Sequence, residues 1–145
     1  MNDVERRMIR WYWRQVGGTL VEECPIVSRI DGSRSPVVDG LIIRRGQWQI
    51  ADAAEVALAG HDLIVLNACA GGLNLELMGR ACFSARLLEG FRPQSLYSVA
   101  LVLRDDPVLR PLLEENRTMK VVVCPDLRTQ PVEVGAVLLD EEAAE

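Results

Sequence analysis

The fold is decided by residues His61–Phe91, which read HDLIVLNACAGGLNLELMGRACFSARLLEGF. An apolar run at Leu63–Leu66 has the length and β-branched content of a strand buried on both faces. Small and polar residues follow at Asn67–Ala70, and two glycines then separate this segment from a helical pattern. Apolar residues recur at helical spacing over Leu73–Leu88. Because sites in open α/β sheets gather where strands end, we expect Asn67–Ala70 to lie at a functional site.

Length and composition predict one ordinary domain. The chain has 145 residues, 49% of them hydrophobic and 26% charged, which is enough to bury a core. No apolar run approaches the ~20 residues that span a bilayer, and the charged N-terminus is unlike a signal peptide. We therefore expect no membrane partner and a cytoplasmic location. The net charge of −5 argues against the whole chain acting as an electrostatic trap for nucleic acid.

The four cysteines, Cys24, Cys69, Cys82 and Cys124, show neither CxxC pairing nor the spacing of a zinc finger. Three of them fall in apolar, strand-like runs. We therefore expect buried, reduced thiols rather than a metal site or a disulfide framework.

Hydrophobic periodicity predicts the other elements. Helices are expected at residues 3–16, 73–88 and 108–115, and strands at 19–27, 37–43, 47–50, 63–66, 96–103 and 119–124. Asn2 and Glu5 fit a capping box for the first helix, and Gly90 is expected to end the second. Residues 51–60 fit either a helical turn or a strand. We therefore predict a single α/β domain over residues 1–125, with a mixed central β-sheet flanked by helices, and an edge strand or acidic tail over 126–145.

The order of these elements resembles the PD-(D/E)XK nuclease superfamily, the restriction-endonuclease-like proteins, over residues 3–103. The resemblance implies an αβββαβ core. In that family an aspartate after a proline lies on the second strand, and an acid-X-lysine triplet lies on the third. Pro36-Val37-Val38-Asp39 matches the first part with one extra residue, and Asn67-Ala68-Cys69 stands at the place of the triplet.

The chemistry of the family explains why this triplet is degenerate. Two carboxylates hold Mg²⁺ against the scissile phosphate, and the lysine assists the attacking water. Asp39 is a plausible ligand, while Asn67 keeps an oxygen but has lost the charge. Cys69 cannot replace a lysine, because a thiol is neutral or negative. Lys120, the only lysine, lies on a distant strand.

Other residues could restore such a site. Glu22 or Glu23 could supply a second carboxylate from the first strand, and Arg80 on the second helix could supply a positive charge. The resemblance thus implies candidate Mg²⁺ ligands at Asp39, Asn67 and Glu22, and candidate catalytic positions at Asp39, Asn67, Cys69, Glu23 and Arg80. Each also has a structural interpretation: Asp39 as part of a bend, Asn67 as a strand-end cap and Glu22–Glu23 as a solvated edge.

Three functions stay open. The first is a nuclease-like protein with an inactive metal site that acts through weak contact with DNA or RNA or with a protein. Arginines on the first helix and in the 28–35 loop favour nucleic acid. The second is a non-catalytic homo-oligomeric interaction module that uses Trp11–Trp13 of the N-terminal helix as its interface, for example in a homodimer. The third is an active, Mg²⁺-dependent nuclease with surrogate acidic residues.

Overall fold

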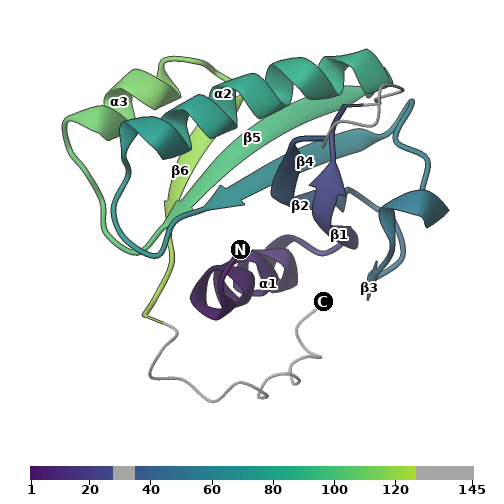
Figure 1. Ribbon diagram of the computed structural model, residues 1–145, viewed down its shortest axis with the longest axis horizontal. Helices are drawn as coiled ribbons and strands as arrows, with labels where there is room; N and C mark the ends of the chain where they lie inside the picture. The colour runs from purple at the N-terminus through teal and green to yellow at the C-terminus, as the bar shows by residue number, and fades with distance from the viewer. Residues whose placement is uncertain (28–34, 127–145) are drawn as a thin grey trace.

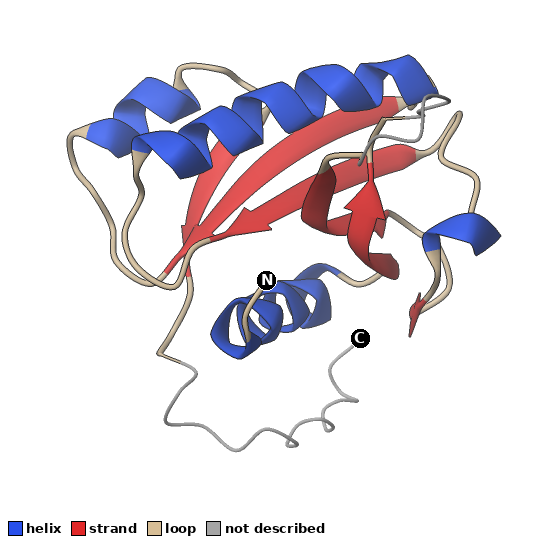
Figure 2. Cartoon of the chain, in the orientation of Figure 1, coloured by secondary structure: helices blue, strands red, loops and turns tan. Residues whose placement is uncertain are grey.

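A computed structural model describes residues 1–27 and 35–126. In this part of the chain a six-stranded sheet has helices on both faces (Figure 1), and Figure 2 distinguishes helices, strands and loops. The helices are α1 (Asp3–Val16), α2 (Leu75–Leu88) and α3 (Leu109–Glu114), with short 3₁₀ helices η1 (Ala53–Glu55) and η2 (Glu89–Phe91). The strands are β1 (Thr19–Pro25), β2 (Val37–Ile43), β3 (Gln49–Ile50), β4 (Asp62–Ala68), β5 (Ser95–Val102) and β6 (Met119–Val123).

The sheet is mixed, as the sequence predicts. Its strand order is β3-β1-β2-β4-β5-β6. β1 and β2 pair antiparallel, and β2 also pairs antiparallel with β4. β4, β5 and β6 run parallel to one another, with α2 and α3 as the crossovers. β4 is therefore central and is paired on both sides, which agrees with its nearly continuous apolar run.

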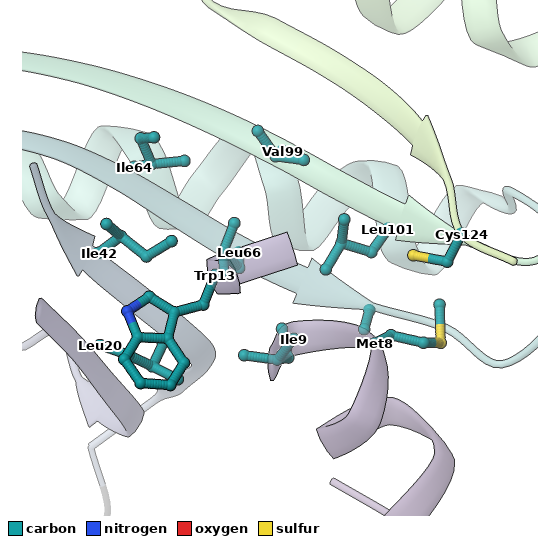
Figure 3. Packing of buried hydrophobic residues seen from close by; sticks show 11 residues of the cluster. Met8, Ile9, Trp13, Leu20, Ile42, Ile64, Leu66, Val99, Leu101 and Cys124 are labelled. Carbon is teal, nitrogen blue, oxygen red and sulfur yellow. The ribbon is translucent and has the colours of Figure 1, made fainter. Parts of the chain in front are cut away.

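α1 covers one face of the sheet. Its buried residues Met8, Ile9 and Trp13 point at apolar side chains from β1, β2, β4 and β5 (Figure 3). The predicted capping box is present, because the Asn2 side chain accepts from the Glu5 amide at 2.8 Å and the Glu5 side chain accepts from the Asn2 amide at 3.2 Å. α2 and α3 cover the opposite face (Figure 1).

The aromatic run on α1 is used largely within the chain. Trp13 stacks on Trp48 with 4.6 Å between ring centroids, and its indole N–H donates to the Gly18 carbonyl at 2.7 Å. Trp11 and Tyr12 are half-buried and pack against the apolar cluster that Met8, Ile9 and Trp13 form with the sheet. A homodimer through this segment stays a prediction, with less free aromatic surface than the sequence suggests.

The C-terminal end of α2 differs from the expectation. Gly90 does not end the helix; it lies inside η2, and the left-handed residue is Arg92, with φ at 58°. The Arg92 carbonyl accepts from the Gly60 amide at 2.9 Å. The chain therefore turns away from the helix at Arg92, two residues later than predicted.

Residues 51–60 form neither a full helix nor a strand, and η1 supplies only a 3₁₀ turn. Most of the predicted arginine loop, at 28–34, and the predicted edge strand or tail, at 127–145, lie outside the described residues. Within the described ranges, the helices are too short or too polar to cross a bilayer.

Candidate functional site

The candidate site lies where β2 and β4 run side by side beneath α2. Gly40 of β2 pairs with Leu66 of β4, so Asp39 and Asn67 occupy the next position along the two strands. Successive side chains alternate between the faces of a strand. Gly40 faces α1, where an added Cβ would lie 2.9 Å from Ile9 Cγ2, and Asp39 therefore faces α2.

The Asp39 carboxylate is held by hydrogen bonds from other residues of the chain. It is 8% exposed, and its Oδ2 accepts from Arg80 Nη2 of α2 at 2.6 Å and from the Ala68 amide at 2.8 Å. The Arg80 interaction joins opposite charges, which makes it one of the strong kind of hydrogen bond. The Ala68 amide belongs to the last residue of β4, so Asp39 binds together β2, β4 and α2.

Asn67 forms a second polar link between the sheet and α2. It is 1% exposed, and its Nδ2 donates to Ser84 Oγ at 3.2 Å. Close by, Ser98 of β5 donates its hydroxyl to the Ala81 carbonyl at 2.8 Å. Neither serine is among the residues predicted from sequence for this cluster. A signal was present for Ser84, which follows Arg80 by four residues and so shares its side of the helix.

Cys69 directly follows β4, at the position where the resemblance expects a lysine. Its half-buried thiol lies 3.8 Å from Nδ2 of Asn74, the residue that caps α2. The four cysteines, all within the described residues, are free. Cys24 and Cys124 are buried as expected, whereas Cys69 and Cys82 are only half-buried. Burial raises the pKa of Cys24 to about 11 and the pKa of Cys124 to about 12.

Glu22 lies on the other face of the sheet. It pairs with Gly40 across β1 and β2, so its side chain points toward α1 and away from Asp39. There it accepts from Arg10 Nε at 2.7 Å and from Arg6 Nη1 at 2.9 Å. Burial raises the pKa of Glu22, but the hydrogen bonds and charges of the two arginines outweigh burial and lower it overall.

The geometry therefore does not bring Glu22 together with Asp39 and Asn67 as the candidate ligand set requires. The interpretation of Glu22 as a solvated edge residue also fails, because its carboxylate is held in an ion-pair cluster. Glu23 has a φ of 50°, and its carboxylate lies 3.8 Å from the N-terminal amine of Met1. It too is directed toward the start of α1.

The donor set at Asp39 does not fit Mg²⁺. This ion is usually held by one or two carboxylates with waters in octahedral geometry. Here a single carboxylate already pairs with the cationic Arg80, and the neighbouring amide of Asn67 points a donor at Ser84. Over residues 1–27 and 35–126, no three histidine, cysteine or acidic side chains come together to hold a metal ion.

A shallow groove of about 220 Å³ opens beside this cluster, between the start of β2 and α2. Its lining includes the polar residues Asn67, Arg80 and Ser84 and is otherwise mostly apolar. The remaining lining residues are Ile26, Pro36, Val37, Val38, Gly79, Phe83 and Leu87.

Comparison of the chain with models of protein families, with curated proteins and with solved structures found no match.

Proposed function

We propose that this chain is a non-catalytic, nuclease-like domain in which an internal ion pair has replaced the metal site, and that it acts by contact with a protein. The α/β arrangement and the adjacency of Asp39 to Asn67 are compatible with the restriction-endonuclease-like resemblance. The observation that carries the proposal is the 2.6 Å contact between Arg80 and Asp39.

This contact bears on catalysis in two ways. The guanidinium places a permanent positive charge on the carboxylate that a metal ion would need. Arginine also stays protonated and makes a poor general base, so Arg80 does not replace the missing lysine. With Asn67 and Cys69 in the triplet, no group in the cluster is suited to activating a water on a phosphodiester.

The distribution of charge favours a protein partner over nucleic acid. Arg80 is paired with Asp39, and Arg6 and Arg10 are paired with Glu22. Affinity for nucleic acid depends on cations that are available to phosphates. Arginines that are already paired with acids of the same chain add little affinity for phosphates. The chain as a whole also carries a net charge of −5. The apolar walls of the groove are better suited to a protein surface.

The direct test is cleavage of labelled single- and double-stranded DNA and of RNA in Mg²⁺ or Mn²⁺. Wild type is compared with Asp39→Ala and with a restored variant, Asn67→Glu/Cys69→Lys/Arg80→Gln, which rebuilds the triplet and frees Asp39. We expect no cleavage by wild type. Cleavage by wild type that disappears in Asp39→Ala would show a working site and overturn the proposal.

A binding measurement separates the two kinds of partner. Fluorescence anisotropy of labelled DNA and RNA is followed at 50 mM and 200 mM salt, the range over which phosphate contacts weaken steeply. We expect no salt-sensitive binding at micromolar protein. Salt-sensitive binding that Arg80→Gln abolishes would instead assign the site to nucleic acid.

A further inference from the structure

The outer side of α2 is unusually apolar for a surface helix. Leu75 is 75% exposed, Phe83 is 64% exposed and Leu87 is 42% exposed, although the opposite side of the same helix is buried on the sheet. α2 runs along the outside of the molecule (Figure 1). A helix that is apolar on both sides normally has a partner on both sides. We name the exposed residues Leu75, Phe83 and Leu87, together with the half-buried Gly79 between them, the α2 outer face.

The residues of this face follow one another at intervals of four, which places them along one line of the helix. Gly79 leaves a hollow in that line, because an added Cβ there would meet nothing within 4 Å. Phe83, one turn further on, is the largest projection. A hollow and a projection on the same face are what a self-complementary helix contact needs, because the ridges of one helix must enter the grooves of the other.

The pattern is symmetric about Ala81. Gly79 and Phe83 are equidistant from it in sequence, and so are Leu75 and Leu87. Two copies of α2 that pack antiparallel through their outer faces, with the two-fold axis at the height of the buried Ala81, therefore bring each phenylalanine to the height of the other copy's glycine. The terminal leucines meet at the two ends of the contact.

The charges on α2 favour the same orientation. Glu76 lies in the first turn and Arg86 in the last turn. In an antiparallel pair the first turn of each helix lies beside the last turn of the other, so acids and arginines of the two copies approach each other. A parallel pair would instead bring like charges together at both ends.

We propose that the α2 outer face binds the α2 outer face of a second copy of this chain in an antiparallel, two-fold symmetric dimer. Phe83 of each protomer enters the hollow at Gly79 of the other. This interface is separate from the N-terminal helix considered from sequence. It does not depend on whether the Asp39 cluster is catalytic.

The size of the face limits the strength of the dimer. A helix of 14 residues is about 21 Å long, and a standard interface buries about 800 Å² per partner. One helix is short for that area, so exposed apolar residues of the groove beside α2, such as Val37, must also contribute. We expect a weak dimer with a dissociation constant on the order of micromolar.

Sedimentation velocity of the full chain between about 1 and 200 μM, around the expected dissociation constant, tests the proposal. Wild type should shift from monomer to dimer over this range. Phe83→Glu removes the projection and brings two charges into the contact, so we expect a monomer at every concentration. Gly79→Gln fills the hollow and should also weaken association at least tenfold, while its monomer melts at a higher temperature because glycine is a poor helix former.

The matched control is Leu112→Glu, which places the same charge at an exposed apolar position on α3. We expect it to dimerise like wild type. A wild-type chain that stays monomeric throughout, or Phe83→Glu and Gly79→Gln variants that dimerise as well as Leu112→Glu, would overturn the proposal. Because Gly79→Gln is expected to be more stable than wild type, its loss of dimer cannot be attributed to misfolding.

Discussion

At the scale of single residues, two glycines have opposite surroundings. Gly40 lies under α1, where an added Cβ would be 2.9 Å from Ile9 Cγ2 and 3.4 Å from the methyl groups of Leu20 and Leu66. Gly79 lies on the surface of α2 with open space around it. The first glycine is required for the close approach of α1 to the sheet, and the second is not required by the fold of the monomer.

This difference predicts opposite effects of the same substitution. Gly40→Ala forces Ile9 to move in a packed core and should lower the free energy of unfolding by about 1–3 kcal/mol. Gly79→Ala should raise it by about 0.5–1 kcal/mol, because alanine restricts the unfolded chain and favours helix. Urea denaturation at low micromolar protein measures both. Equal effects of the two substitutions would contradict the packing described for α1.

At the scale of elements, α1 is joined to β1 by charge as well as by apolar packing. Glu22 of β1 is bound by Arg6 and Arg10, which lie one turn apart on α1. The sequence predicted the helix and the strand correctly, because each has a clear period of its own. It did not predict that Glu22 faces α1, because that depends on the pairing of β1 with β2 and on a left-handed residue at Glu23.

The link between α1 and β1 should depend on pH. Because the pKa of Glu22 in the folded chain is lowered from its usual 4.5, the ion pairs stabilise the fold above that pH. Their contribution is lost as the pH falls through the lowered pKa. At pH 7, Glu22→Gln should lower the free energy of unfolding by about 1–2 kcal/mol.

Urea denaturation of wild type and Glu22→Gln at pH 7, 5, 4 and 3 measures this contribution. The gap between the two proteins should shrink toward pH 3. Glu55→Gln, at an exposed position in η1, is the control and should follow wild type at every pH. A gap that stays constant down to pH 3 would show that the charge of Glu22 has no role in stability.

At the scale of the whole molecule, the α/β class and the mixed sheet could be predicted from sequence, because buried strands and amphipathic helices leave strong periodic patterns. The residues near the site could also be named, since Asp39 and Asn67 lie on strands and Arg80 lies on the following helix. Their contacts could not be predicted. Whether Arg80 reaches Asp39, or Ser84 reaches Asn67, depends on the register of β2 against β4 and on the rotation of α2 over the sheet.

The proposed function depends on which of two roles the Asp39 carboxylate has. A carboxylate kept for a metal ion is usually costly to the fold without the metal, and its removal often stabilises the protein. A carboxylate kept for an internal ion pair has the opposite effect, because removing it leaves a cation and a backbone amide without their acceptor. Asp39 has the contacts of the second kind.

The most direct test of this account is the free energy of unfolding of Asp39→Asn relative to wild type, at pH 7 without divalent cations. We predict a loss of about 2 kcal/mol, reduced from the value for a fully buried pair because Arg80 is partly exposed. In an Arg80→Gln background, which lacks the partner charge, the same Asp39→Asn change should lower the free energy of unfolding markedly less. An Asp39→Asn protein as stable as wild type, or more stable, would contradict the claim that the ion pair has replaced the metal site.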